Sequence, residues 1–390
     1  MTADDDTTTD IAIVGGGAVG LAAALALAQD GRQVTLIGPP PAPNDGRTVA
    51  LLGGSWTQLT ELGLGDELLD KSAPLAVMRL VDDSGSLFRQ PPVEFRASEI
   101  GRDAFGWNIR NDDLTALLAE RAAGMDTLRI VTGTVHDISP DPSQVALEGE
   151  GFAPLRARLV IGADGRRSRV RAAAGIEARE WRYPQVALTA ILAHSRDHRE
   201  TSTEFHTRSG PCTLVPLPGR FSSLVWLLDP EEAEQIGALD DAAFARRLER
   251  QVHSLLGTMK VVGTRGRIPM GGLSVDRFGA GRMMLAGEAA HVFPPIGAQG
   301  LNLGLRDVAA LREALAGAAD PGAESVIAAY DRARRTDVRL RTGAVDVLNR
   351  TLLTDMLPAD LLRGAGLLAL SRIGPLRRFA MRQGLGGRAA

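Results

Sequence analysis

The chain has 390 residues, of which 44% are apolar and 23% charged, so it fits a soluble globular protein with room for two domains. Its net charge of -3 argues against general nucleic-acid binding, and its single cysteine, Cys212, excludes an internal disulfide and any CxxC metal or redox site. We therefore expect a reducing, intracellular compartment.

Several short patterns are absent from the sequence. The six histidines are scattered without an HExxH pair, so we expect no metal site. No GxxxxGK[ST] occurs, which excludes a P-loop nucleotidase. The acidic start, MTADDDTTTD, lacks the basic and apolar regions of a secretory signal, and no apolar run is long enough to span a bilayer. These features predict a cytoplasmic protein.

The first elements of the chain form a dinucleotide-binding pattern. They are a buried strand at 10–14, GGGAVG at 15–20, a helix at 21–29 and a second strand at 33–37. In this βαβ setting Gly15 permits the tight turn, Gly17 lets the backbone approach a pyrophosphate, and Gly20 lets helix and strand pack closely. The phosphates would lie at the helix N-terminus, where unpaired N–H groups and the helix dipole favour anions.

The second strand departs from this pattern at its end. An Asp or Glu there commonly holds the adenosine ribose, but this strand ends in Gly38 followed by three prolines. The ribose must be held by another group, for which the backbone and Arg47 are candidates. The loss weakens an NAD interpretation more than an FAD interpretation, because FAD has many other contacts along its length. The alternative role for Arg47 is that of a solvated loop arginine.

The next part of the chain alternates helices and strands. Helices are expected at 55–69 and from about Asp112, and strands at 78–87, 93–95, 128–131, 134–138 and 156–161. The last strand runs into GADGRRSRVR at 162–171, where Asp164 would lie at a strand's carboxyl end, the place where ligands collect in open α/β sheets. Its carboxylate can accept from ribose or ribityl hydroxyls, or serve as a plain turn residue. Ser168 would cap or line the following helix.

Residues 186–225 change character and predict antiparallel strands. Asp229 and Pro230 then begin a predicted helix that runs to about Leu256, and another extended segment begins at Arg267. We interpret this region as a β-rich layer inserted between halves of the nucleotide-binding domain. Alternate strand residues share a face, which would be either an apolar substrate face or an ordinary domain core. The residues concerned are Phe205, Leu214, Pro216 and Trp226.

A predicted strand at 282–286 leads into a stretch with four glycines, residues 287–311. Such a loop lets backbone N–H groups approach a flat or charged ligand, and a helix beginning near Leu301 or Asn302 points its positive end at the same object. We interpret His291, within this stretch, as a structural residue rather than a catalytic base.

The tail from Leu361 onward contains six arginines, no acidic residue, and apolar residues at helical spacing. It is either a closing helix packed on the body or a basic amphipathic surface for an anionic membrane or partner.

Three motifs in order, GGGAVG at 15–20, GADGRRSRVR at 162–171 and GEAAHVFPPIGAQGLNLGLRD at 287–307, resemble those of the class A flavoprotein aromatic monooxygenases. The narrower resemblance is to the ubiquinone-biosynthesis hydroxylase family, and it covers essentially the whole chain. It extends to DGRTVAL after the second strand, GPCTLVPLPG in the middle region and PLRRFAMRQGL in the tail.

The resemblance implies an α/β fold, with a Rossmann-like FAD-binding domain, an inserted antiparallel β-sheet substrate domain and a C-terminal helical segment. The implied domain bounds are 1–75, 100–180 and 272–345 for the FAD-binding domain, 76–99 and 181–271 for the substrate domain, and 346–390 for the tail.

The resemblance also implies which residues contact FAD. The implied cofactor-binding residues are Gly15, Gly17, Ala18, Val19, Gly20, Arg47, Asn111, Asp164, Gly287, Glu288, Pro295, Gly297, Ala298, Gln299, Gly300, Leu301 and Asn302. Pro295, Gly297 and Gln299 are those implied at the reacting ring. The sequence departs from the family pattern at three places, where Asn111 replaces an arginine, Glu288 an aspartate and Ala298 a glycine.

The implied activity is hydroxylation of the aromatic ring of a polyprenylated phenol or quinol intermediate in ubiquinone biosynthesis, with O₂ and NAD(P)H or another electron donor. The protein would then be an FAD-dependent monooxygenase with a lipophilic substrate, no nucleic-acid partner, and peripheral membrane or biosynthetic-complex association. Two alternatives stay open. One is a class A hydroxylase of a soluble aromatic compound, and the other is a flavin-binding assembly subunit of a biosynthetic complex.

Overall fold

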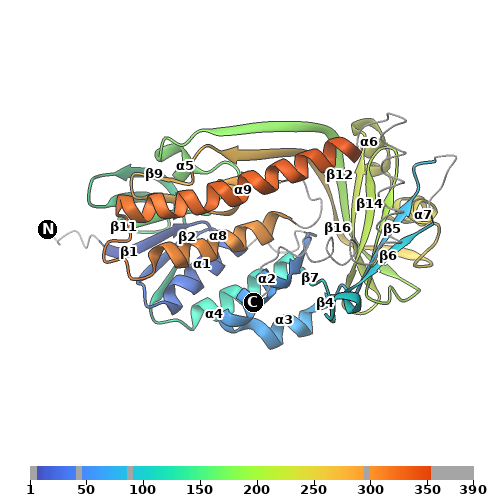
Figure 1. Ribbon diagram of the computed structural model, residues 1–390, viewed down its shortest axis with the longest axis horizontal. Coiled ribbons are helices and arrows are strands. Elements are labelled where there is room, and N and C mark those ends of the chain that lie inside the picture. The colour runs from blue at the N-terminus through green and yellow to red at the C-terminus, as the bar shows by residue number, and fades with distance from the viewer. Residues whose placement is uncertain (1–6, 41–45, 86–90, 294–298, 353–390) are drawn as a thin grey trace.

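A computed structural model of the protein describes residues 7–40, 46–85, 91–293 and 299–352. Figure 1 shows two lobes side by side, each built on its own large sheet, joined by a long two-stranded ribbon along one side.

The first lobe is built on a parallel sheet with strand order β18-β11-β1-β2-β8. These strands are β1 (Thr7–Val14), β2 (Val34–Gly38), β8 (Leu128–Thr132), β11 (Leu155–Gly162) and β18 (Met283–Leu285). Antiparallel strands extend it: β10 (Val145–Glu150) pairs with the first part of β11, β9 (Thr134–Pro140) pairs with β10, and β17 (Gly279–Ala280) pairs with β18 at the edge. The helices α1 (Ala18–Gln29), α4 (Asn111–Ala123) and α8 (Gln299–Leu315) share its core.

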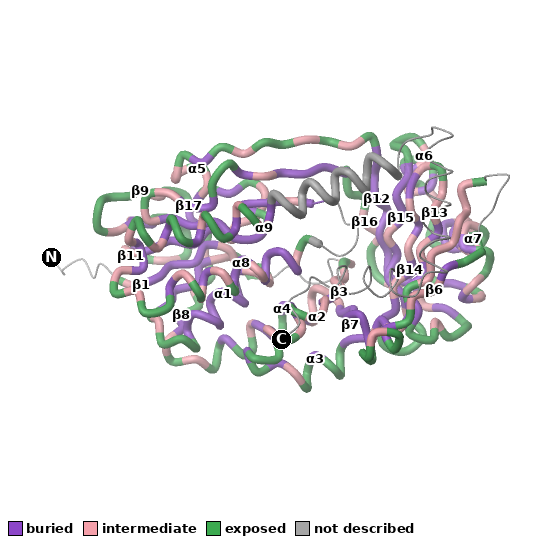
Figure 2. The backbone as a smooth tube through the Cα atoms, in the orientation of Figure 1, coloured by how far each residue is buried: buried purple, intermediate pink, exposed green. Residues whose placement is uncertain are grey.

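The core of this lobe forms around β1 and α1. Ile11, Ala12 and Ile13 are fully buried in the strand, and α1 is apolar and buried on nearly all sides. Such a helix needs cover on every face, which the sheet, α4 and α8 supply (Figure 2).

The second lobe is a mixed sheet with strand order β19-β16-β12-β15-β14-β13-β5-β6. Its strands are β5 (Val77–Asp82), β6 (Val93–Arg96), β12 (Ala178–His194), β13 (Thr201–His206), β14 (Pro211–Leu217), β15 (Phe221–Leu228), β16 (Met259–Val275) and β19 (His291–Val292). Two helices, α6 (Pro230–Gly237) and α7 (Asp241–Gln251), cover one face and enclose a second apolar core.

The ribbon between the lobes is the antiparallel pair β12 and β16, each of 17 residues. At one end Ala178 pairs with Val275 beside the first lobe, and at the other His194 pairs with Met259 in the second. The predicted domain boundaries at 180 and 271 fall inside these continuous strands, so the chain passes between lobes without a loop. The division into two domains stays our prediction.

A small sheet, β3-β7-β4, lies against the second lobe. It consists of β3 (Thr48–Leu52), β7 (Gly106–Arg110) and β4 (Ser72–Pro74). The buried Asn108 side chain donates to the carbonyl of Pro216 at 2.8 Å and to the Ser223 hydroxyl at 3.3 Å, while the Thr48 hydroxyl donates to Ser223 at 2.8 Å. These bonds place one face of the large sheet against β3.

Most predicted elements are confirmed, and the misses have physical reasons. The helix predicted at 55–69 is three pieces, α2 (Gly53–Leu59), a π-helical turn (Thr60–Leu64) and α3 (Gly65–Lys71), because Gly63 has a φ of +87°. The helix predicted to reach Leu256 is likewise two helices, since the Asp240 carboxylate accepts from the Ala243 N–H at 2.7 Å and begins a new one. The strands β3, β4, β7, β10, β17 and β19 were not predicted.

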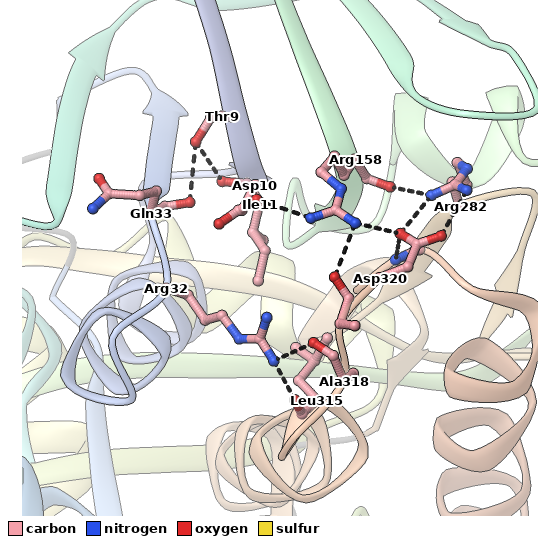
Figure 3. Close-up of polar contacts among 12 residues, drawn as sticks. Thr9, Asp10, Ile11, Arg32, Gln33, Arg158, Arg282, Leu315, Ala318 and Asp320 are labelled. Atoms are coloured by element: carbon pink, nitrogen blue, oxygen red, sulfur yellow. Dashed lines mark hydrogen bonds and ion pairs between the residues drawn. The ribbon is translucent and has the colours of Figure 1, made fainter.

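A polar network closes the outer end of the first lobe (Figure 3). The Asp320 carboxylate, in the loop before α9 (Glu324–Leu352), accepts from Arg282 at 2.8 Å and from Arg158 at 3.4 Å. Arg158 also pairs with Asp10 of β1, and Arg32 donates to the last carbonyls of α8. The network thus fixes the loop that connects α8 to α9.

Among the described helices, none is long and apolar enough to cross a membrane.

Asp320→Asn tests this network by its pH dependence. The hydrogen bond from Arg282 is the main cause that holds the pKa of Asp320 below its usual value of 3.8. A lowered folded-state pKa contributes stability above the unfolded value, and that stability is lost as the pH falls through the folded-state pKa. We expect Asp320→Asn to lower the Tm by about 1–3 °C at neutral pH, with a loss that shrinks below pH 3.8. Thermal unfolding of both proteins across pH measures this, and Asp126→Asn, at an exposed loop residue, is the control.

Candidate cofactor and active site

Three neighbouring parallel strands bring the three sequence motifs to one edge of the first sheet. β1 ends at the glycine motif of residues 15–20, β11 at residues 162–171, and β18 at the turn that begins with Gly287. Because β18, β11 and β1 are adjacent, their carboxyl ends meet at the same edge.

The first motif combines tight packing with one open position. Gly15 has a φ of +125°, and a Cβ there would lie 2.2 Å from the Ala163 carbonyl oxygen of the second motif. A Cβ on Gly20 would lie 1.9 Å from the Gly15 carbonyl oxygen. By contrast, a Cβ on Gly17 would meet no atom of the described part of the chain within 4 Å. The N-terminus of α1 is therefore packed tightly against the neighbouring backbone at Gly15 and Gly20, while the described residues leave space beside Gly17.

Gly38 has a steric reason to replace the acidic residue expected at the end of β2. A Cβ on Gly38 would lie 2.3 Å from the backbone nitrogen of Gly16. No side chain fits there without moving the phosphate-binding turn, so the ribose-binding role cannot fall to this position.

Val19 joins the first motif to the third. Its side chain would be 3.1 Å from a Cβ on Gly287 and 2.6 Å from a Cβ on Gly304. Gly287 itself has a φ of +61°, which favours glycine. The start of α1, the turn at 287 and α8 are thus in direct contact.

Asp164 is committed to its own turn. One carboxylate oxygen accepts from the Ser168 hydroxyl at 2.5 Å, and the other from the backbone N–H of Arg169 at 2.7 Å. Ser168 in turn caps the short helix α5 (Arg169–Ala173) by accepting from the Arg171 N–H, as predicted. This geometry supports a turn-forming role, and the carboxylate retains further lone pairs for a ligand.

Arg47 and Asn111 lie together at the edge of β3. The Arg47 side chain is exposed, and its carbonyl accepts from the Asn111 N–H at 3.0 Å, where α4 begins. Arg47 and Asn111, which are both predicted to contact FAD and are far apart in the sequence, are therefore neighbours in the fold.

The start of α8 is open on one side and pinned on the other. A Cβ on Gly300 would meet none of the described residues within 4 Å. The buried Asn302 side chain donates to the Ala50 carbonyl at 2.7 Å and accepts from the Leu52 N–H at 2.9 Å. Asn302 therefore attaches the helix to β3. The helix begins at Gln299, two residues earlier than predicted.

The remaining predicted site residues are placed in part. Glu288 is exposed and Leu301 is half-buried. Pro295, Gly297 and Ala298 lie outside the described residues, as does the side chain of Gln299. Their roles stay predictions.

Sequence reasoning missed a buried ionic network beneath the turn at 287. Asp307 of α8 is fully buried and accepts hydrogen bonds from the Gly287 N–H, the His291 ring and Arg334 of α9. Burial disfavours the charged form of Arg334, yet the carboxylates of Asp307 and Asp337 hold its pKa above the usual value. The signal was present, because Asp307 falls between Leu303 and Leu311 on the apolar stripe of the helix.

Arg171 clamps the same turn from the second motif. Its guanidinium donates to the Ala289 carbonyl at 2.9 Å and to the Arg166 carbonyl at 2.8 Å. The turn at 287 is therefore fixed by side chains from α5 and α8.

The predicted apolar substrate face is wrong, and the alternative of a domain core is confirmed. Phe205, Leu214 and Trp226 lie in the core beneath α6 and α7, and Pro216 is buried. The strand alternation was right, but the helices cover that face. The opposite face, which carries Ser223 against β3, holds another apolar cluster. Its members are Tyr183, Ala187, Val225, Leu227 and Met270.

These observations fit a dinucleotide such as FAD. The N-terminus of α1 has no acidic residue in its first turn and no side-chain cap, so its N–H groups are available to phosphates. The start of α8 offers a second positive helix end with an open glycine, suited to an anionic ring.

Comparison with known families and proteins agrees with this fit. The FAD binding domain family matches residues 8–342 of the chain. A ubiquinone hydroxylase, UbiL, of Rhodospirillum rubrum is 35% identical over 99% of this chain and 91% of its own length. The 3-demethoxyubiquinol 3-hydroxylase of Escherichia coli is 31% identical over 97% of this chain and 98% of its own.

Solved structures share the fold. The p-nitrophenol 4-monooxygenase PnpA of Pseudomonas putida superposes with a TM-score of 0.82 at 21% identity, covering 98% of this chain and all of its own. The flavin-dependent monooxygenase PieE, solved in complex with FAD and substrate, gives a TM-score of 0.72 at 20% identity, covering 98% of this chain and 72% of its own.

Gly17→Asp tests the phosphate end of the site. Because a Cβ at Gly17 meets no described residue within 4 Å and the φ of Gly17 is -78°, the described part of the fold accommodates a side chain there. The new carboxylate would face the pyrophosphate, and like charges at that distance weaken binding by several kcal/mol, or about a hundredfold or more. We expect an unchanged Tm for the apoprotein and a large rise in the Kd for FAD, measured by flavin fluorescence. Gly17→Ala is the matched control and should bind FAD; equal binding by Gly17→Asp would contradict this placement.

Proposed function

This chain belongs to the FAD binding domain family and, within it, to the ubiquinone hydroxylases, and from that premise we propose that it hydroxylates the aromatic ring of a polyprenylated phenol or quinol intermediate in ubiquinone biosynthesis. It is an FAD-dependent monooxygenase, an oxidoreductase, that uses O₂. The observation that carries the proposal is the meeting of three motifs at one sheet edge, with two helix N-termini open beside them.

The chain's own residues bind and orient the cofactor. Backbone N–H groups from Gly17 onward would hold the pyrophosphate, and the first turn of α8, behind Gly300, would lie near the ring. When bound, FAD supplies the redox and oxygen chemistry of the hydroxylation. The helix dipole of α8 favours negative charge on the reduced ring. No nucleophilic side chain is required.

The second lobe supplies the other side of the reaction site. The apolar cluster that contains Val225, Leu227 and Met270 lies on the sheet face that carries Ser223 against β3, next to the strand that Asn302 pins to α8. A wall of this kind suits an aromatic ring with an apolar chain, and it excludes water from the reacting atoms.

The proposal also includes the electron donor and the association of the protein with a membrane or a biosynthetic complex. NAD(P)H is the donor that the family resemblance favours. A polyprenyl substrate resides in lipid, so we also propose peripheral association with the inner face of the membrane or with a biosynthetic complex. The arginine-rich composition after Leu361 supports an anionic partner surface, although that segment lies outside the described residues.

A strain that lacks this protein tests the reaction directly. We expect it to accumulate a ubiquinone precursor that is short of one ring hydroxyl, because the preceding steps continue. Mass spectrometry of the lipid extract identifies the precursor. The purified protein, loaded with FAD and given reductant and O₂, should convert that precursor in detergent or lipid. If the protein hydroxylates only soluble phenols, it is a class A hydroxylase of a soluble aromatic compound. If Gly17→Asp restores ubiquinone synthesis in the deletion strain, the protein acts as an assembly subunit of a biosynthetic complex.

Val225→Trp tests the substrate wall. Val225 is half-buried in the apolar cluster, so a larger side chain there occupies space in front of the sheet face. We expect hydroxylation to fall about tenfold or more, in line with a misplaced substrate, while FAD content stays at the wild-type level. Product formation and flavin absorbance are measured on the same sample. Leu69→Trp, at a side chain 54% exposed on α3, is the control; unchanged hydroxylation in Val225→Trp would remove this face from the site.

A further inference from the structure

We propose that Asp307 and His291 are positioning residues for the flavin, which hold the backbone turn from Gly287 to His291 in place from beneath. The inference rests on the proposed function only through its cofactor, FAD. It concerns how the protein fixes the ring end of the site rather than which substrate it takes.

Both oxygens of the Asp307 carboxylate accept hydrogen bonds. Oδ2 accepts from the Gly287 N–H and from His291 Nε2, each at 2.7 Å, and Oδ1 accepts from Arg334 Nε at 2.6 Å. The carboxylate only accepts, so Nε2 of His291 carries the proton. One buried group thereby ties the first and last residues of the turn to each other and to α8.

The network extends to α9 and is closed to solvent. Arg334 continues to Asp337 at 2.8 Å, and the His291 ring lies near the rings of Phe278 and Phe293. The side chains of Asp307 and His291 are 0% and 1% exposed. In such surroundings a hydrogen bond to a charge is strong, and its geometry is not softened by water.

Packing alone does not account for this arrangement. Among the residues that the structure describes, His291 Nδ1 and one Arg334 terminal nitrogen are buried and have no hydrogen-bond partner. Buried polar atoms without partners cost stability, and apolar residues of similar volume would fill the space without that cost. Departures of this kind are expected where a fold fixes a functional geometry.

The geometry that is fixed is that of the cofactor turn. Gly287 has a φ of +61° and contacts Val19 of the phosphate-binding motif, and Glu288 is exposed between buried neighbours. A shift of this turn would therefore move the Val19 contact and the outward carboxylate together. Loss of the anchor should weaken FAD binding and change the environment of its ring.

The test compares FAD affinity and the flavin absorption spectrum in three variants. Asp307→Asn replaces one carboxylate oxygen, which accepts hydrogen bonds, by an amide NH₂ group, which would face the donors of Gly287, His291 or Arg334. His291→Leu removes the second bond, and His291→Gln keeps an N–H at nearly the same place. We expect the FAD Kd to rise about ten- to hundredfold in Asp307→Asn and about tenfold in His291→Leu, the range for losing a hydrogen bond to a charged group. His291→Gln should recover most of the affinity and the wild-type spectrum.

Asp30→Asn, just after α1, is the matched control, because Asp30 also pairs with a side chain of α8. It removes the ion pair that Arg312 makes near the other end of α8, and it should leave the FAD Kd and spectrum unchanged. Should Asp307→Asn fail to fold, the His291 pair decides the question alone. Wild-type affinity and spectrum in His291→Leu, or equal losses in His291→Leu and His291→Gln, would overturn the proposal. Because hydroxylation is not measured, a protein that binds FAD but hydroxylates nothing would contradict the proposed function and leave this result standing.

Discussion

The structure depends on backbone turns that approach one another more closely than any side chain permits. At the carboxyl edge of the first sheet, a Cβ on Gly15 would lie 2.2 Å from the Ala163 carbonyl, and one on Gly38 would lie 2.3 Å from the nitrogen of Gly16. Since these turns end three adjacent strands, their packing decides where the N-terminus of α1 points. The position of the phosphate site therefore follows from how closely the turns at the ends of these strands pack.

Around that edge, buried polar side chains attach the separate elements of the site to one another. Asn302 pairs with the backbone of β3, Asp307 with the turn at Gly287, and Asn108 with the strands of the second lobe. Each is buried, so each bond acts in a low dielectric and loses much if broken. The ring end of the site is thereby built from elements whose positions are mutually fixed.

The sequence was sufficient for the fold class and for the residues that meet at the edge, because glycine spacing and strand-helix periodicity are local signals. It was insufficient where tertiary contacts decide. Alternation placed Phe205, Leu214 and Trp226 on one face, but which face the helices α6 and α7 would cover depends on chain topology. Asp307 could be predicted only in part. The sequence shows a charged residue on the apolar stripe of a helix, but it does not show that His291 and Arg334, 16 and 27 residues away, are its partners.

The place of β1 at the centre of its sheet has a consequence for the order of assembly. Its partner β2 is made soon after it, but Ile11 pairs with Leu159 on the other side, and the cover that α8 gives α1 comes only after the whole second lobe has been synthesised. A chain emerging from the ribosome therefore exposes one apolar edge of β1 for much of its synthesis. The core of the nascent nucleotide-binding lobe is incomplete until α8 and the start of α9 have been made, so we expect this lobe to finish folding late in synthesis.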